Sequence, residues 1–202
     1  EGGATPLGRF LGDGLLLVEL DGVRRVLRLD GAERTQLGLL PPLPGESIMQ
    51  EASLARGQRY VVDAGITYDE DGTQRGPLPV GVLWLDDGRY LALPPAAAEL
   101  SLADLDDSRL LLRGPDRVAI VDARSGAVVA TVASPLEGPL EGAGFLDVGS
   151  LWLADGRDLA VYDLTAGREA RRLRHQADAV VQVEGAPGSL VLIACDQPWR
   201  RL

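Results

Sequence analysis

The second half of the chain contains a sequence repeat with a constant interval. Residues 116–122 (DRVAIVD) correspond to residues 157–163 (RDLAVYD), and each segment is followed by a glycine, Gly126 or Gly167. The same interval relates Leu110 to Leu151 and Val132 to Leu173. A repeat of about 40 residues fits a unit of four antiparallel strands. The repeat therefore restricts this part of the chain to an array of similar β units.

Six Asp-Gly pairs mark turns along the chain. They occur at positions 13–14, 21–22, 30–31, 71–72, 87–88 and 155–156. Glycine reaches positive φ without a steric penalty and aspartate tolerates the left-handed region, so the pair suits the tight turn of a β-hairpin. Apolar runs flank these pairs, as residues 15–20 and 23–29 flank Asp21-Gly22. The pattern predicts consecutive antiparallel strands joined by short turns.

Residues 118–126 (VAIVDARSG) and 159–167 (LAVYDLTAG) resemble repeats of the WD40, YVTN and quinoprotein-like β-propeller families. In those families an apolar strand ends at Asp, turns through Gly and returns as the outer strand. The resemblance covers residues 108–195 well, and the first half by its hairpin pattern and residues 83–91. It implies an all-β, propeller-like array of four-stranded antiparallel blades. The Gly-His and Trp-Asp pairs of WD40 blades are absent from the sequence, so no subfamily is assigned.

The number of candidate strands limits the size of the array. We count about fourteen, enough for three to four complete four-stranded blades, and so expect about four to five blades in one irregular or incomplete domain over residues 1–202. Two stretches are predicted to be short helices in insertions. They are residues 47–56, with Ser47 as N-cap and Gly57 as C-terminal stop, and residues 96–106, after two prolines.

The repeat also predicts core residues. Val118 and Ile120 correspond to Leu159 and Val161, and we expect all four to be buried in equivalent strands of successive blades. Trp84 and Trp152 stand at matching places in similar segments and are expected in the blade cores. Because aromatic residues make up only 4% of the chain, aliphatic side chains must supply most of the core.

The composition excludes several classes of partner. The net charge is −10, which opposes non-specific binding to nucleic acid or to an anionic membrane. All 20 basic residues are Arg, with no Lys and no Asn, a bias that indicates a GC-rich genome and so a bacterial source. The 202 residues contain no signal-peptide pattern and no apolar run of about 18 residues, which favours a cytoplasmic location.

Few residues suit catalysis or metal binding. Cys195 follows an apolar run and is predicted to be a buried, inert thiol, while His175, the only histidine, cannot by itself complete a zinc site. Asp69, Glu70 and Asp71 form an acidic run, but their spacing departs from a calcium loop and predicts a solvated hairpin tip. Phosphate-binding loops, dinucleotide-binding motifs and serine nucleophile elbows are absent from the sequence. We therefore expect no catalytic, cofactor-binding or metal-binding residues.

A basic cluster in residues 168–175 is the best candidate for a binding site. The repeat places its four arginines on an outer strand, where they could dock an acidic partner through bidentate pairs with carboxylates. A solvated strand face explains the same residues without a partner. Near the C-terminus, a tryptophan beside two arginines is a second candidate contact. The candidate partner-binding residues are Arg168, Arg171, Arg172, Arg174, His175 and Trp199.

These features favour a non-enzymatic protein–protein interaction scaffold of a bacterial multi-component system, with another protein as partner. By fold analogy alone, one such system groups propeller proteins with MoxR-type ATPases and von Willebrand A proteins. The alternative is a lyase or hydrolase that uses carboxylates in an axial pocket. A ligand- or sugar-binding propeller module is a third hypothesis, which the low aromatic content disfavours.

Overall fold

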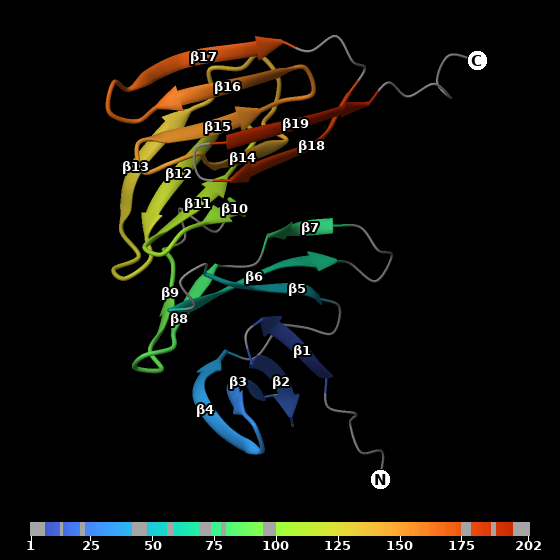
Figure 1. Ribbon diagram of the computed structural model, residues 1–202, viewed down its shortest axis with the longest axis vertical. Coiled ribbons are helices and arrows are strands. Elements are labelled where there is room, and N and C mark those ends of the chain that lie inside the picture. The colour runs from blue at the N-terminus through green and yellow to red at the C-terminus, as the bar shows by residue number, and fades with distance from the viewer. Residues whose placement is uncertain are drawn as a thin grey trace, which may run out of the picture. The chain divides into compact units, whose positions relative to one another are not determined.

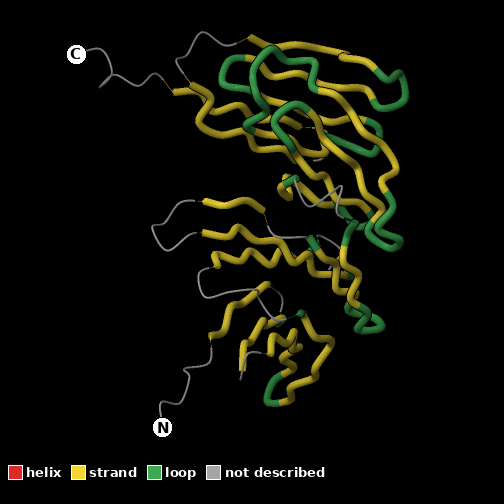
Figure 2. The backbone as a smooth tube through the Cα atoms, turned by 180° about the vertical axis from the view of Figure 1, so that it is seen from behind, coloured by secondary structure: helices red, strands yellow, loops and turns green. Residues whose placement is uncertain are grey.

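The computed structural model describes residues 7–12, 14–20, 23–41, 48–55, 59–68, 74–77, 80–94, 100–174, 179–186 and 189–195 (Figure 1). Within these ranges the regular elements are all β-strands, and no helix is present (Figure 2). The chain divides into two compact units. The first comprises Glu1–Ser101 and Ala123–Gly126, and the second comprises Leu102–Asp122 and Ala127–Leu202. The fold is an all-β, propeller-like array of antiparallel sheets, and a single domain over residues 1–202 stays a prediction.

The first unit contains two sheets of consecutive strands. Sheet A has the order β1-β2-β3-β4, and sheet B has the order β5-β6-β8-β9, with β7 paired to β6. The strands are β1 (Leu7–Gly12), β2 (Leu15–Leu20), β3 (Val23–Asp30), β4 (Glu33–Leu40), β5 (Ile48–Leu54), β6 (Tyr60–Tyr68), β7 (Gln74–Pro77), β8 (Gly81–Trp84) and β9 (Tyr90–Ala92).

The core of the first unit lies between sheets A and B. Leu15, Val26 and Leu40 from sheet A pack with Val61 and Leu83 from sheet B, and all five are buried. Residues Ala123–Gly126, the turn after β12, belong to this unit. Each sheet buries one face against the other, as two-layer β packing requires.

The second unit contains three sheets. Sheet C has the order β10-β11-β12-β13, sheet D the order β14-β15-β16-β17, and sheet E only β18-β19. The strands are β10 (Ser101–Leu105), β11 (Arg109–Arg113), β12 (Arg117–Asp122), β13 (Val128–Ala133), β14 (Gly142–Phe145), β15 (Ser150–Ala154), β16 (Asp158–Asp163), β17 (Arg168–Arg174), β18 (Ala179–Ala186) and β19 (Ser189–Cys195).

The sequence repeat is confirmed as the relation between sheets C and D. β11 and β12 match β15 and β16 residue for residue, with the same bounds once the interval of the repeat is applied. The turn glycines Gly126 and Gly167 both have positive φ, 73° and 64°. The outer strand of each sheet has a register shift at the same place, after Ile120 in sheet C and after Val161 in sheet D.

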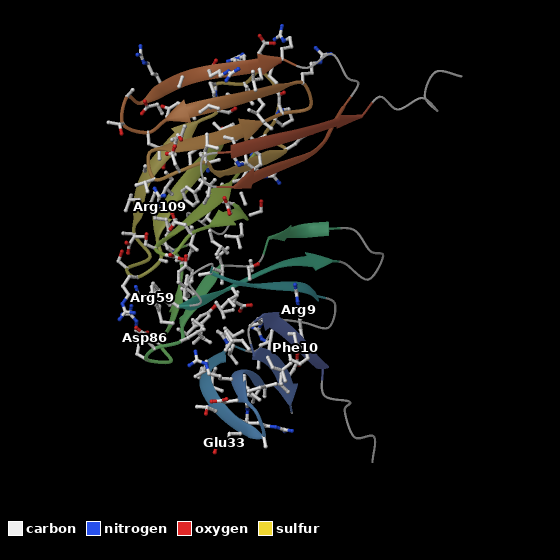
Figure 3. All side chains as sticks on the ribbon, in the orientation of Figure 1. Arg9, Phe10, Glu33, Arg59, Asp86 and Arg109 are labelled. Carbon is white, nitrogen blue, oxygen red and sulfur yellow. The ribbon has the colours of Figure 1, made fainter. Side chains whose placement is uncertain are left out.

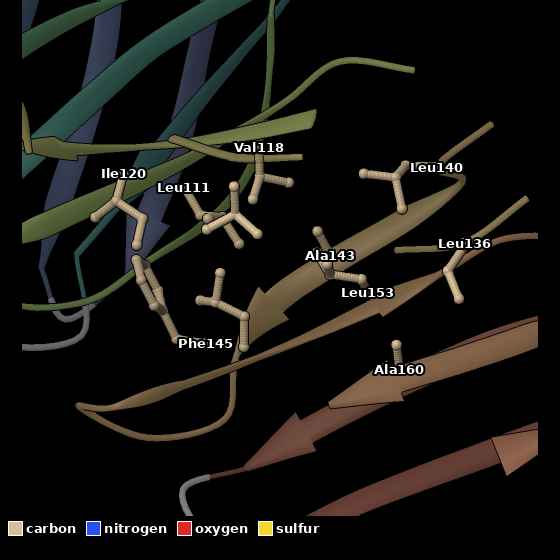
Figure 4. Close-up of a cluster of buried hydrophobic side chains, with 11 residues drawn as sticks. Leu111, Val118, Ile120, Leu136, Leu140, Ala143, Phe145, Leu153 and Ala160 are labelled. Carbon is tan, nitrogen blue, oxygen red and sulfur yellow. The ribbon is translucent and has the colours of Figure 1, made fainter. Parts of the chain in front are cut away.

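The core of the second unit lies between sheets C and D (Figure 4). Val118 and Ile120 from β12 pack in one cluster with Phe145, Leu153 and Ala160 of sheet D. A smaller cluster around Trp152 and Leu159 occupies the opposite face of sheet D. Both faces of sheet D are therefore partly covered, as expected for a blade inside an array.

Three of the four predicted core residues of the repeat are fully buried. Val118 and Leu159 are 0% exposed and Ile120 is 2% exposed, whereas Val161 is only half-buried. Trp84 and Trp152 are both buried, as predicted. Their strands are not equivalent, because β8 is third along sheet B and β15 is second along sheet D.

The two predicted helices are wrong where the structure describes them. Residues Ile48–Leu54 form β5, and Ser101–Leu105 form β10. β5 pairs with β6 along its whole length, from Ile48 opposite Thr67 to Leu54 opposite Val61. Pairing with a neighbouring strand outweighs weak local helix propensity. These two strands account for part of the difference between the estimate of about fourteen strands and the nineteen that the described ranges contain.

The predicted Asp-Gly hairpins are confirmed by the strands that flank them, which pair antiparallel in all six cases. Gly14, Gly31 and Gly88 have the positive φ that favours glycine in tight turns. The turn at Asp155 differs, because its carboxylate Oδ1 accepts hydrogen bonds from the amides of Arg157 and Asp158. These hydrogen bonds from the following backbone amides to the aspartate side chain close the turn, so no residue with positive φ is needed.

Candidate functional site

The predicted arginine cluster lies on β17, the outermost strand of sheet D (Figure 1). Arg168, Arg171, Arg172 and Arg174 are all exposed. The other two predicted contact residues, His175 and Trp199, lie outside the described residues. The same holds for the acidic run Asp69–Asp71, and the side chain of Cys195 on β19 is likewise not described.

Two arginines of β17 share one face of sheet D. Arg171 is opposite Val161 and Arg168 is opposite Asp163 in the β16–β17 register. Directly opposed residues of antiparallel strands point to the same face, and residues two apart on β16 do so as well. Arg168 and Arg171, three residues apart, reach the same face because the strand has a bulge at Ala170.

The other two arginines point to the opposite face and are engaged in ion pairs. Arg174 donates from Nε and Nη2 to the two carboxylate oxygens of Asp158, each at 2.9 Å. Arg172 donates from Nη2 to Glu169 Oε2 at 2.6 Å and to the carbonyl of Pro135 at 2.7 Å. Its Nη1 lies 3.7 Å from Asp158 Oδ2. These two arginines therefore hold the outer hairpin together.

The charges on this face are mutually compensated. The hydrogen bond and charge of Asp158 raise the pKa of Arg174, and the Glu169 hydrogen bond raises the pKa of Arg172. The Asp158 side chain is 5% exposed, whereas that of Arg174 is 69% exposed. Asp158 thus obtains in the fold the counter-charge that a buried carboxylate requires.

Arg168 and Arg171 are both exposed. Neither makes a hydrogen bond or an ion pair with any residue that the structure describes. Of the four predicted arginines, the structure thus places two in a structural ion-pair network and two on the opposite face of sheet D, where they have no partner among the described residues. The sequence signal could not distinguish them, since all four lie within seven residues of one strand.

A polar pocket that sequence reasoning missed lies beside this network. It has a volume of about 660 Å³ and lies between the β15–β16 turn and the segment that connects β13 to β14. Four carboxylates line it, those of Glu137, Glu141, Asp155 and Asp158, together with the guanidinium of Arg174. The Glu-Gly-Pro-Leu-Glu-Gly run over residues 137–142 was the sequence signal for it.

Two of the pocket carboxylates, Asp155 and Asp158, accept hydrogen bonds from other groups of the protein. Besides closing its own turn, Asp155 accepts a hydrogen bond from the amide of Gly138 at 3.1 Å. Burial opposes the ionisation of Asp155, but the amide bonds from Asp158, Arg157 and Gly138 outweigh it and lower the pKa of this carboxyl. Asp158 is bound by Arg174. Only Glu137 and Glu141 extend exposed carboxylates at the pocket.

The first unit has a buried ion pair between its two sheets. Arg24 of β3 donates from Nη1 and Nη2 to the carboxylate oxygens of Asp63 on β6, at 3.0 and 2.9 Å. The Nε and Nη2 groups of Arg24 also donate to the carbonyl of Pro41. Burial and the charge of Asp63 raise the pKa of the nearby Tyr90 to about 12. These four hydrogen bonds of Arg24 all join it to other segments of the first unit, so we interpret the pair as structural.

Trp84 is the centre of a second contact in the first unit. Its Nε1 donates to the carbonyl of Ala123 at 3.0 Å, and the guanidinium carbons of Arg124 and Arg59 lie 4.5 and 5.9 Å from its ring centroid. Arg124 also approaches Asp86, and Arg59 and Asp86 are labelled in Figure 3. The arginines cover the tryptophan and stabilise its position by cation–π contact.

No group of three or more His, Cys, Asp or Glu side chains within the described ranges could hold a metal ion. Over the same ranges, no helix is long and apolar enough to cross a membrane.

Comparison with known proteins places the fold. No protein-family model matches the chain, and no curated protein matches it. A solved structure of the computationally designed Ika8 protein matches 93% of this chain and 54% of its own, with a TM-score of 0.60 and 15% identity. A eukaryotic initiation factor matches 91% of this chain and 47% of its own, with a TM-score of 0.59 and 13% identity. The likeness establishes the fold alone.

A third solved structure, of the mitotic checkpoint complex, matches 84% of this chain and 51% of its own, with a TM-score of 0.54 and 13% identity. The chain thus spans about half the length of each of the three structures.

Proposed function

We propose that this chain is a non-enzymatic protein–protein interaction scaffold that binds an acidic segment of another protein through Arg168 and Arg171. The observation that carries the proposal is the division of the β17 arginines into a compensated pair and a free pair. Two exposed arginines without a described partner, held on one face of a strand, can form bidentate bonds with carboxylates. His175 and Trp199 are retained as proposed flanking contacts.

Because the net charge of the chain is −10, we expect an acidic partner to bind only at the arginine pair. An acidic partner is repelled by most of the surface and attracted at the arginine pair, so the charge pattern favours one orientation. Exposed arginines on an outer strand also discourage edge-to-edge aggregation, and that role needs no partner. The experiment must therefore separate binding from solubility.

We also propose that the scaffold belongs to a bacterial multi-component system. The exclusive use of Arg for all 20 basic residues supports a GC-rich bacterial genome. Two of the structures that this chain resembles in fold are named as the mitotic checkpoint complex and a eukaryotic initiation factor. These likenesses support a scaffold role by fold analogy only.

The charge-reversed variant R168E/R171E tests the proposal. Proteins captured from an extract of the source organism by the wild-type chain are compared with those captured by this variant and by a matched control, R28E/R34E. The control reverses two exposed arginines of β3 and β4 in the other unit. We expect a protein captured by the wild type and the control but lost with R168E/R171E, and its purified form to bind at least about tenfold more weakly to that variant. An identical set of captured proteins for all three chains would refute the proposal.

The carboxylate-lined pocket favours one alternative, a lyase or hydrolase. Its two free carboxylates, Glu137 and Glu141, are the acid–base pair that this function would use. Turnover of a substrate that E137Q and E141Q each abolish, with unchanged thermal stability, would establish this function instead of the scaffold.

A further inference from the structure

β13 is the outer strand of sheet C and lies in the middle of the continuously described residues 100–174 (Figure 1). It pairs with β12 on one side, and no described strand pairs with its other side. The backbone groups on that other side have no hydrogen-bond partner among the described residues. An edge of this kind can pair with another strand.

The hydrogen bonds to β12 determine which backbone groups of β13 point outward. The N–H of Ser134 donates to the carbonyl of Asp116 at 2.7 Å. In an antiparallel pair, residues that bond to the neighbouring strand alternate with residues whose N–H and C=O point away from it. Val132, two residues before Ser134, therefore bonds to β12. Thr131 and Ala133 direct their N–H and C=O groups outward, and both residues are exposed.

The side chains of β13 carry no charge. Its sequence is VVATVA, which contains no proline and consists mostly of β-branched residues. Val128 and Val129 are 43% and 58% exposed. β17, the outer strand of sheet D, has instead the sequence REARRLR, whose arginines oppose pairing with an identical strand. Of these two outer strands, β13 is the one that lacks the charges by which proteins prevent edge pairing.

A bulge limits the part of β13 that can pair regularly. The register with β12 shifts at Val129, an extra residue with no direct partner opposite. The regular edge therefore extends from Ala130 to Ser134, and its outward groups are those of Thr131 and Ala133. This edge is about 17 Å long, too short to bury by itself the roughly 1,200 Å² of a stable complex. Pairing through it is therefore weak and reversible.

We propose that two copies of this chain pair antiparallel through β13, about a two-fold axis at Val132. In this register Thr131 of one copy lies opposite Ala133 of the other, and the two residues exchange both of their outward hydrogen bonds. The symmetry repeats this pair, so all outward backbone groups of Thr131 and Ala133 are bonded in both copies. The same axis brings the exposed Val129 of each copy beside Pro135 of the other.

The side chains of β13 favour a second copy as the occupant. An identical strand meets no like charge at this edge and supplies the β-branched side chains that pair well across an antiparallel ladder. A charged segment of another protein finds no counter-charge on β13. The dimer goes beyond the proposed function, because it does not use Arg168 or Arg171. Salt distinguishes the two, since it screens the repulsion between two chains of net charge −10 and strengthens the dimer, but weakens binding of an acidic segment to arginine.

The test measures sedimentation velocity of the whole chain over a range of protein and salt concentrations, together with amide hydrogen exchange of β13. Thr131→Pro removes an outward N–H and leaves the bonds to β12 in place, and Val129→Lys puts a charge at the edge. Val148→Lys is the matched control, because Val148 is 84% exposed and lies between β14 and β15.

We expect a dimer that strengthens with salt, and exchange at Thr131 and Ala133 that slows as protein concentration rises. We expect a dissociation constant at least about tenfold higher in each of Thr131→Pro and Val129→Lys, and an unchanged one in Val148→Lys. The melting temperature of each variant shows whether it is folded.

Each other outcome overturns the inference. A monomer at every concentration refutes the dimer. Equal weakening by Val129→Lys and Val148→Lys would show general apolar association instead of pairing through β13. A dimer in which Thr131 and Ala133 exchange as fast as in the monomer would place the interface elsewhere. Slow exchange of both amides at every concentration would show that the same copy already covers the edge. The capture experiment with R168E/R171E decides the proposed function separately.

Discussion

Removal of Asp63 should destabilise the first unit strongly, because it leaves the Arg24 guanidinium buried without its counter-charge. The two side chains are 4% and 9% exposed, and two hydrogen bonds of 2.9–3.0 Å join them. The change is Asp63→Val, which suits a strand and keeps the volume similar. Its comparison is the double variant R24M/D63V, which replaces the pair by apolar groups.

The expected magnitude follows from the contacts. Each charge-assisted hydrogen bond contributes about 1.5–3 kcal/mol, and loss of one partner of a buried ion pair costs about 3–5 kcal/mol. We therefore expect Asp63→Val to lower the free energy of unfolding by about 4 kcal/mol. In the double variant both charges of the Arg24–Asp63 pair are absent. The main loss is then the two hydrogen bonds that Arg24 donates to the carbonyl of Pro41. That loss should cost about 1–3 kcal/mol.

Unfolding in urea, followed by circular dichroism, gives the overall stability, but two units need not unfold together. Native-state amide exchange of β3 and β6 reports the first unit directly, and exchange of β12 and β16 in the second unit serves as the control. A loss below about 1 kcal/mol for Asp63→Val would refute the reasoning. So would a double variant less stable than the single one.

Three further changes test other contacts. Gly144→Ala would place its Cβ in steric conflict with Nε1 of Trp152, and such overpacking should cost about 1–3 kcal/mol in thermal or urea unfolding. Gly149→Ala, whose nearest described neighbour would lie 3.7 Å from the new Cβ, should be near neutral. The lowered pKa of Asp155 means that its contribution is present above its ordinary value of 3.8 and is lost as pH falls through the folded pKa. In Asp155→Asn the melting temperature, measured from neutral to acid pH, should therefore fall less steeply than in the wild type. The pKa of Tyr90, raised from 10.0 to about 12, predicts that stability falls as pH rises from 10.0 to about 12, and Tyr90→Phe should remove this part of the alkaline loss.

Much of the strand pattern in the second unit was predictable from the sequence. The repeat located β11, β12, β15 and β16, and the positive φ of Gly126 and Gly167 follows from their place in it. The Asp-Gly pairs located the hairpins in the same way. These signals are readable because turn conformation depends on one or two residues and their intrinsic φ preferences.

The strands β5 and β10 were not predictable from the same signals. Their residues carry weak local preference, and pairing with β6 and β11 determines their conformation. Strand pairing joins segments that are separate in the sequence, and local propensity does not encode it.

The sequence identified the arginines of β17 as a candidate binding cluster, but it could not separate Arg168 and Arg171 from Arg172 and Arg174. The tertiary structure decided this, because a one-residue bulge in β17 sets which face each side chain occupies. Likewise Arg24 and Asp63 are 39 residues apart and meet only when sheets A and B pack. Local turn chemistry is written in adjacent residues, whereas the partners of a charged side chain are chosen by packing between distant strands.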